Sequence, residues 1–237
     1  MKISIMQPYF FPYLGYFSLI KHTDRFILLD DVQFIRHGWI ERNRILRQAG
    51  GWIYIKVPIT KKDGRSTLIK NIKIDNKTNW KDKILAQLHH YKKIAPYYPE
   101  VIKTIVNLFK DEFNDIVSLN KAALESVCIY LGIEHQISVY SAMGLSIEKV
   151  NSPDEWALNI CKAIENVNEY WNPEGGAGLF DINKYTQNDI KIRFIKLRQI
   201  QYLQGNSGFE ANLSIIDLLM FNSINSANQL IDEFYFL

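Results

Sequence analysis

Three short segments of this 237-residue chain combine residue types that could bind and modify a small molecule. The first reads QPYFFPYLGY at residues 7–16, the second reads DDVQF at 30–34, and the third reads NPEGG at 172–176. Phenol, amide and carboxylate groups can orient hydroxyls, amines and phosphates through hydrogen bonds. The first segment supplies the candidate binding residues Gln7, Tyr9, Tyr13, Gly15 and Tyr16.

The third segment is a candidate loop for a phosphate or a carboxylate. Gly175 and Gly176 allow backbone N–H groups to approach an anion at a helix start, beside the amide of Asn172. The segment lacks the Lys-Ser/Thr ending of a P-loop and the GxGxxG spacing, so an ordinary tight turn is an equal alternative.

The two aspartates of the second segment differ in what they can reach. Adjacent side chains of an extended chain point to opposite sides, so at most one of Asp30 and Asp31 faces a site. We expect that residue to be Asp31, in register with Gln33. The alternative for Asp30 is a structural role, in which it caps the turn.

Histidine and cysteine offer little further chemistry. His89 and His90 are adjacent in a predicted helix, so only one of them faces the interior, and no metal site is indicated. His90 is a candidate catalytic group, with a solvent-exposed helix histidine as the alternative. Cys128 and Cys161 form no zinc or disulfide pattern and have no base at a suitable spacing, which predicts a reducing cytoplasm and no nucleophilic catalysis.

Basic residues are concentrated in one part of the chain. Residues 36–83 contain 13 Lys or Arg and four Asp or Glu, a net charge of +9, whereas the whole chain carries only +3. Such an excess attracts phosphates or other anions, although for residues 61–83 we favour the alternative, a solvated lysine-rich face of a hairpin. The candidate binding residues here are Trp39, Arg42 and Asn43.

Arg42 is the first candidate for gripping a phosphate. It lies three residues after Trp39, so the two share a face if this segment is helical. The alternative is that Arg42 pairs with Glu41 or Asp31 and pins the loop.

Composition narrows the class of protein. With 47% hydrophobic and 22% charged residues the chain can fold around a sizeable core, which excludes disorder, collagen and coiled coil. The overall charge gives no case for nucleic-acid binding. The apolar residues 9–20 are too short to span a bilayer and are interrupted by Pro12 and Gly15, so we expect part of the fold there and no membrane partner.

Hydrophobic periodicity predicts an α/β fold. Apolar or alternating runs predict strands at 2–7, 25–29, 136–140, 168–171 and 191–195, with helices between them. An antiparallel pair is predicted for 51–57 and 68–74 around Asp63-Gly64. We expect one elaborated domain, residues 1–237: a doubly wound, mainly parallel, Rossmann-like sheet with a helical block inserted at 76–133. The three chemical segments then follow strand ends, where such sheets bind ligands.

The motifs resemble the WbqC-like family of bacterial proteins over essentially the whole chain. They read MKISIMQPYFFPYLGYFSLI, DRFILLDDVQFIRHGWIERNRI, YWNPEGGAGLFD and QYLQGNSGFEANLSIIDLLMFN, with Trp171 where an aliphatic residue is expected. The resemblance ties the chain to O-antigen and other surface-polysaccharide loci. It carries over these positions: Gln7, Pro8, Tyr9, Pro12, Tyr13, Gly15, Tyr16, Asp31, Gln33, Trp39, Arg42, Asn43, His90, Asn172, Gly175, Gly176, Gln204, Ser214 and Asp217.

A more distant similarity is to the nucleotidylyltransferase-type fold that includes pantothenate synthetase. That family carries an H-x-G-H box, whose two histidine positions are Tyr13 and Tyr16 in this chain. A neutral phenol does not offer the charge that an imidazolium gives a departing pyrophosphate.

These observations lead to one main hypothesis and two alternatives. The main hypothesis is a cytoplasmic enzyme that transfers an acyl or aminoacyl group to a nucleotide-linked amino sugar, with aminoacyl-tRNA left open as donor. Asp31, Gln33 and His90 would be catalytic, and the other candidates would bind the nucleotide sugar. The alternatives are a Mg-NTP-dependent nucleotidylyltransferase, with Asp31 near the metal, and a non-catalytic nucleotide-sugar-binding protein. The identity of the sugar and the oligomeric state stay open.

Overall fold

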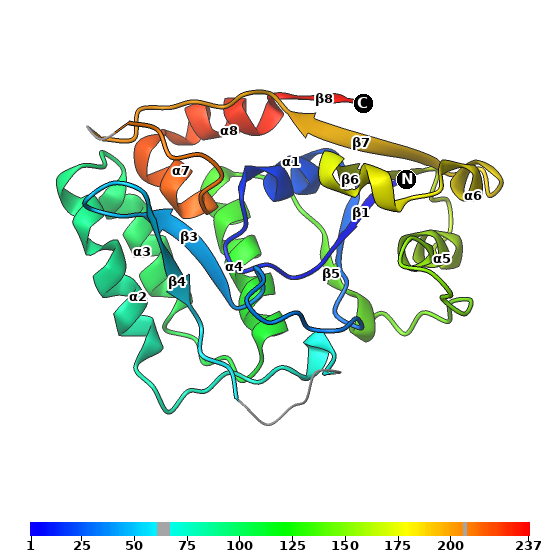
Figure 1. Cartoon of the computed structure of the whole chain (residues 1–237), viewed down its shortest axis with the longest axis horizontal. Helices are drawn as coiled ribbons and strands as arrows, with labels where there is room; N and C mark the ends of the chain where they lie inside the picture. Colours follow the sequence, from blue (N-terminus) through cyan, green and yellow to red (C-terminus); the bar gives the residue numbers. More distant parts are fainter. Residues whose placement is uncertain (61–66, 206–207) are drawn as a thin grey trace.

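A six-stranded sheet forms the centre of the protein in a computed structural model that describes residues 1–60, 67–205 and 208–237. The strand order is β5-β2-β1-β6-β7-β8 (Figure 1). The first five strands run parallel, and β8 pairs antiparallel with β7. The strands are β1 (Lys2–Met6), β2 (Arg25–Leu28), β5 (Ile137–Val139), β6 (Glu169–Pro173), β7 (Lys191–Leu197) and β8 (Phe234–Phe236). The predicted α/β fold with a mainly parallel sheet is therefore confirmed.

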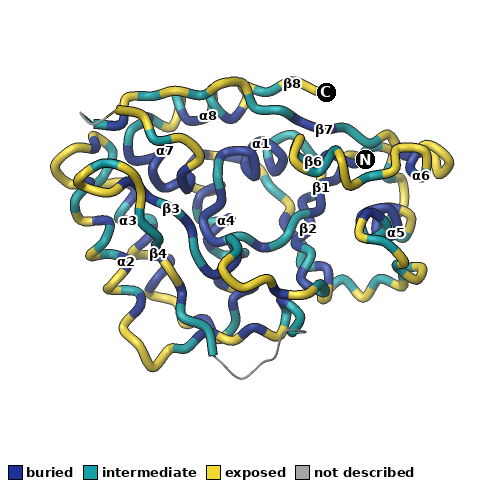
Figure 2. Tube along the Cα trace, in the orientation of Figure 1, coloured by how far each residue is buried: buried dark blue, intermediate teal, exposed yellow. Residues whose placement is uncertain are grey.

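Side chains alternate between two hydrophobic clusters, one on each face of the sheet. Ile3, Ile5 and Ile27 pack in one cluster with residues of α5 (Glu155–Ala163) and α6 (Ile182–Thr186). Phe26 and Leu28 face the other, larger cluster, which includes α1 (Leu14–His22) and α8 (Ile224–Asp232). Buried segments accordingly run through the sheet and through the helices on both sides of it (Figure 2). This alternation follows from the two-residue period of a strand.

Helices α2, α3 and α4 lie beside the sheet, and the chain between them contains no strand of the sheet. They span Trp80–Leu88, Tyr98–Leu108 and Ile116–Leu131, and the short helix α7 covers Ile215–Phe221. Asp115 caps α4 by accepting a hydrogen bond from the Ser118 N–H at 2.9 Å, and Gly132 ends it at φ +69°. The division into one domain with an inserted block at 76–133 stays a prediction. No helix in the described residues is long and apolar enough to cross a membrane.

The predicted hairpin partner of residues 51–57 is wrong. Strand β4 (Trp52–Lys56) pairs antiparallel with β3 (Arg42–Leu46), forming a two-stranded ribbon. Residues 68–74 instead contain the short 3₁₀ helix η1 (Ile69–Asn71) and isolated bridges. The Asp63-Gly64 turn lies outside the described residues. Strand β3 was not predicted from the sequence, because its first four residues are mostly polar. Of these four, only Asn43 and Ile45 are buried in the core.

Candidate functional site

The order of the strands reverses at the centre of the sheet. Strand β1 leads through α1 to β2 on one side, whereas β5 leads through α5 to β6 on the other side. The carboxyl ends of β1 and β6 therefore lie where two connections diverge, which is the usual ligand position in open α/β sheets. A cavity of about 540 Å³ opens there, and its lining includes Tyr13, Gly15, Glu174, Gly175 and Tyr202. We call it the switch-point cleft.

A smaller cavity of about 210 Å³ adjoins the switch-point cleft and shares Tyr13 and Asn212 with it. Tyr9, Trp39 and Arg44 complete most of its lining, and we call it the aromatic hollow. The guanidinium carbon of Arg44 lies 5.1 Å from the Trp39 ring centroid, and its Nη2 donates to the Asn212 carbonyl at 3.0 Å. One cation is thus held beside aromatic rings at the cleft edge.

Tyr13 is a neutral hydrogen-bond donor between the two cavities. Burial, and then the neighbouring Tyr9 and Glu174, raise the pKa of Tyr13 to about 12. A Cβ atom on Gly15 would lie 2.5 Å from the Tyr13 ring, so only glycine fits at this position. Tyr16 is fully buried and donates from its hydroxyl to the Gln7 carbonyl at 2.9 Å, so that hydroxyl is already used inside the protein.

The loop that precedes Tyr13 is strained and held from two sides. Phe11 is buried and has φ +41°, a left-handed conformation that phenylalanine rarely adopts. Asn43 Nδ2 donates to the carbonyls of Phe10 at 3.0 Å and Phe11 at 2.8 Å. Ser214 Oγ also donates to the Phe11 carbonyl, at 2.7 Å. The ribbon and the start of α7 therefore fix the loop that presents Tyr13.

Glu174 and Gly175 line the switch-point cleft, whereas Asn172 and Gly176 do not line it and pack on each other. Asn172 is buried, and its Nδ2 donates to the Tyr170 hydroxyl at 2.6 Å. A Cβ atom on Gly176 would lie 2.2 Å from Asn172 Oδ1, so this glycine allows the loop to pack on the asparagine. Gly175 lines the switch-point cleft, at the start of a short 3₁₀ helix over Glu174–Leu179. The structure thus brings Tyr13, Gly15 and Gly175 together, with Asn172 behind them.

Asp31 and Gln33 lie elsewhere, beside the segment that contains η1. Asp31 forms an ion pair of 2.6 Å with Lys70, and Gln33 forms an isolated backbone bridge with Leu68. Asp30 is buried and accepts hydrogen bonds from the N–H and the hydroxyl of Ser141, at 3.0 and 2.5 Å. Neither Asp31 nor Gln33 lines the switch-point cleft or the aromatic hollow.

His90 also lines neither cavity. Its Nδ1 lies 2.9 Å from the Gln87 carbonyl, and its ring centroid is 4.3 Å from that of Tyr91. The other ring nitrogen, Nε2, is buried without a partner among the described residues. Both cysteines are buried and unpaired, and burial raises the pKa of the Cys128 thiol to about 12. In the described part of the chain, no three His, Cys, Asp or Glu side chains cluster to hold a metal ion.

Trp39 and Arg42 do not share a helical face, because Arg42 begins strand β3. Its guanidinium donates to the carbonyls of His37 and Gly38 and lies over the Tyr54 ring, 4.0 Å from the centroid. Arg42 therefore pins the loop before β3, although through backbone carbonyls and not through Glu41 or Asp31.

This placement gives a first prediction. Arg42→Lys should lower the free energy of unfolding by about 1–2 kcal/mol, because lysine cannot keep both carbonyl bonds and the ring contact. Nucleotide-sugar affinity should stay within about two-fold of the unmodified protein. Urea unfolding and calorimetric titration on the same variant check both parts. A variant of normal stability that no longer binds would return Arg42 to the site.

Sequence reasoning missed Arg44, Asn212, Tyr202 and Glu174. The signal for Arg44 was its position two residues after Arg42, which puts both on the outer face of a strand. The position of Tyr202 depends on Asp217, whose carboxylate accepts a hydrogen bond from the Tyr202 hydroxyl at 2.8 Å.

Comparison with known proteins is consistent with this arrangement of motifs along the chain. The sequence matches the WbqC-like protein family over residues 7–229, which includes every segment that builds the cleft. The chain belongs to the WbqC-like family. A similar protein is the uncharacterized protein Rv1507c of Mycobacterium tuberculosis (strain ATCC 25618 / H37Rv), 28% identical over 220 residues that cover 92% of each chain. No solved structure matches this WbqC-like chain.

Proposed function

We propose that this WbqC-like protein binds a nucleotide-linked amino sugar at the switch-point cleft and transfers an acyl or aminoacyl group to it. The observation that carries the proposal is that an aromatic hollow with one arginine adjoins a larger cleft at the point where the strand order reverses. The family resemblance supports a role in O-antigen or other surface-polysaccharide assembly, and the two unpaired cysteines support a cytoplasmic location.

The order of the parallel strands supports nucleotide binding. Numbered along the chain, these five strands lie in the order 3-2-1-4-5, which matches the Rossmann-like doubly wound pattern. Tyr9 and Trp39 would stack on the base, and Arg44 would bind a phosphate with its planar fork. Tyr13 and the Gly175 backbone would face the sugar.

The chemistry falls to Tyr13 and Glu174, because Asp31, Gln33 and His90 line neither cavity. The sugar amine attacks the carbonyl carbon of an activated ester or thioester. A C–N bond forms, the donor's C–O or C–S bond breaks, and the leaving group departs with the electron pair. Glu174 would take the amine proton, and the Tyr13 O–H would donate to the oxygen that becomes negative.

The burial of Tyr16 favours this reaction over nucleotidylyl transfer. The second position of the H-x-G-H box must reach a triphosphate, whereas Tyr16 is 0% exposed and donates to Gln7. Mass spectrometry of sugar nucleotides incubated with the protein and an acyl donor separates the proposed enzyme from a non-catalytic binding protein, which would leave the mass unchanged.

Arg44 is the residue that tests the proposed ligand class. Arg44→Lys should weaken the binding of a UDP-linked amino sugar by about ten-fold or more, since lysine keeps the charge but loses the fork. Calorimetric titration measures the loss. The matched control is Arg47→Lys, at an exposed arginine that lines neither cavity. Equal affinities of the two variants would contradict the proposal, as would equal binding of the free amino sugar and its nucleotide form.

A further inference from the structure

A separate cavity of about 910 Å³ lies between the β3–β4 ribbon and the start of α2. Its lining shares no residue with the switch-point cleft or the aromatic hollow. The walls come from the loop before β3, from Tyr54 and Lys56 of β4, and from the segment 75–83 that leads into α2. We call it the α2 cavity. Nothing in the proposed reaction uses it.

One end of the α2 cavity is built to attract an anion. Lys56 and Lys83 line it, their side chains are exposed, and within the described ranges neither has a hydrogen-bond or ion-pair partner. The N-cap residue of α2, Asn79, makes no capping hydrogen bond, because its side chain donates to Asp82 at 2.7 Å. The Trp80 N–H donates to the Thr78 carbonyl at 2.9 Å, which leaves the N–H groups of Lys81 and Asp82 without an acceptor among the described residues. The start of α2 and the two lysines line the same cavity.

The acidic residues of the lining are Asp75 and Glu41, and they differ in their contacts. Asp75 accepts a hydrogen bond from the Lys77 N–H at 3.2 Å. Glu41 is only 2% exposed, and its Oε1 accepts from the His37 N–H at 2.8 Å. Its other oxygen, Oε2, is buried and has no hydrogen-bond partner among the residues that the structure describes. A buried carboxyl oxygen without a donor is costly, and a ligand N–H would satisfy it.

We propose that the α2 cavity is a second ligand site, which binds a small phosphate ester that also carries an amino group. The phosphate lies at Lys56, Lys83 and the first turn of α2, and the amino group donates to Glu41 Oε2. The volume of the cavity is sufficient for a hexose phosphate or a larger molecule. The site goes beyond the proposed transfer reaction and does not depend on it.

Two sugar phosphates that differ only in an amino group test this assignment. Calorimetric titration should show that glucosamine 1-phosphate binds about ten-fold more tightly than glucose 1-phosphate, the gain expected from a hydrogen bond to a charged group. Glu41→Gln, which keeps the shape of the side chain, should abolish that preference. Lys83→Met should weaken both ligands about equally, by several-fold.

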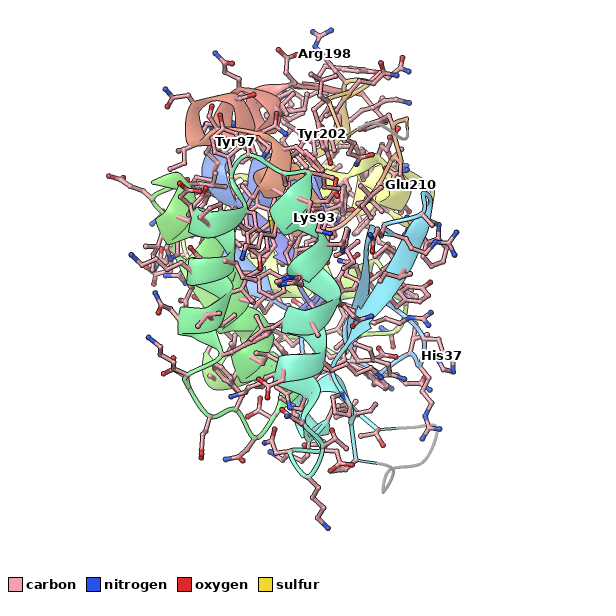
Figure 3. All side chains as sticks on the ribbon, turned by 90° about the vertical axis from the view of Figure 1, so that its left-hand side faces the viewer. His37, Lys93, Tyr97, Arg198, Tyr202 and Glu210 are labelled. Atoms are coloured by element: carbon pink, nitrogen blue, oxygen red, sulfur yellow. The ribbon has the colours of Figure 1, made fainter. Side chains whose placement is uncertain are left out.

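Two further variants locate the binding. Lys93→Met is the matched lysine control, since Lys93 is exposed in the short 3₁₀ helix His89–Lys93 that follows α2 and lies apart from His37 of the cavity lining (Figure 3). This variant should bind both phosphates normally. Arg44→Lys should also leave glucosamine 1-phosphate binding unchanged, whereas its nucleotide-sugar affinity falls if the proposed function holds. If Glu41→Gln does not fold, the Lys83→Met and Arg44→Lys variants still decide between the two sites.

Three results would overturn the assignment of the α2 cavity. The first is equal binding, or no binding, of the two phosphates by the unmodified protein. The second is an unchanged amino preference in a folded Glu41→Gln variant. The third is loss of glucosamine 1-phosphate binding in Arg44→Lys, which would place the probe in the aromatic hollow. Loss of nucleotide-sugar binding alone would affect only the proposed function.

Discussion

Replacing Asp217 with alanine should lower the free energy of unfolding by about 3–5 kcal/mol, since each buried donor left without an acceptor costs about 1–3 kcal/mol. Asp217 is fully buried in the first turn of α7. It accepts hydrogen bonds from the hydroxyls of Tyr91 at 2.6 Å and Tyr202 at 2.8 Å, and from Gln204 Nε2 at 2.5 Å. Removing the carboxylate leaves the Tyr91 and Tyr202 hydroxyls without an acceptor, whereas Gln204 Nε2 keeps the Glu210 carbonyl at 3.0 Å. Urea unfolding followed by tyrosine fluorescence and circular dichroism measures the loss.

Graded variants separate this network from simple loss of packing. Tyr202→Phe removes one donor and leaves two, so we expect a cost of only about 1 kcal/mol. Asp217→Asn keeps the shape of the side chain and one acceptor oxygen. Its cost in free energy of unfolding should fall between those of Tyr202→Phe and Asp217→Ala. A cost below about 1 kcal/mol for Asp217→Ala would show that the hydrogen bonds contribute little to folding.

The network also gives the protein a pH dependence with a definite sign. Burial raises the pKa of Asp217 above its usual value, although the hydrogen bonds from Tyr91, Tyr202 and Gln204 oppose the shift. Folding therefore favours the protonated form of Asp217. The contribution of this preference to the free energy of unfolding is complete below about pH 4 and is lost as the pH rises through the raised pKa. The stability advantage of the unmodified protein over Asp217→Asn should accordingly shrink as the pH is raised from 4.

The central strands could be predicted from the sequence because their pattern is local. The run RFILL predicts β2, which pairs with β1 in parallel, from Ile3 opposite Arg25 to Met6 opposite Leu28. The edge strand β8 (Phe234–Phe236) was not predicted, because three residues are too few to show a strand periodicity. Its pairing partner β7 lies far back in the sequence, which supplies no local signal.

The site could be predicted only in part. Tyr13, Gly15 and Gly175 follow strand ends, and the rule for open sheets is sufficient to bring them to one edge. The choice between Arg42 and Arg44 depends on where β3 begins and on what its neighbours offer, since both arginines are on the outer face of the strand. Arg42 donates to two carbonyls and lies over the Tyr54 ring. Arg44 instead lies beside the Trp39 ring and donates to the Asn212 carbonyl.

The Asp217 network could not be predicted, because its donors come from unrelated parts of the chain. Tyr91 follows α2, Tyr202 and Gln204 lie in the connection after β7, and each contact is a tertiary one. The family resemblance carried over Gln204, Ser214 and Asp217 as positions without roles. The structure shows that two of them join a buried network and that Ser214 supports the strained loop at Phe11.

Asn43→Asp should be nearly as damaging as loss of Asp217, at a cost of about 3–5 kcal/mol for a buried charge without a partner. Asn43 is 4% exposed, and its Nδ2 donates to the carbonyls of both Phe10 and Phe11. Its Oδ1 accepts from the Arg44 N–H at 2.8 Å. The substitution keeps that acceptor but puts a carboxylate oxygen against two carbonyl oxygens. The loop that holds Tyr13 then loses one of the two side chains that donate to the strained residue Phe11, and only Ser214 remains.

A matched substitution separates the charge from the lost hydrogen bonds. Asn43→Ala removes the donor without adding an anion, so it should cost only about 1–3 kcal/mol. The gap in free energy of unfolding between Asn43→Asp and Asn43→Ala should also narrow as the pH falls towards 4. The reason is that the protonated carboxyl of Asn43→Asp can donate to one of the two carbonyls. The introduced group then has a raised pKa in the folded state, and its stability contribution is lost as the pH rises. Unfolding of both variants in urea at pH 4 and pH 7 measures the gap, and a gap that does not change with pH would mean that the loop moves away and leaves the carboxylate in water.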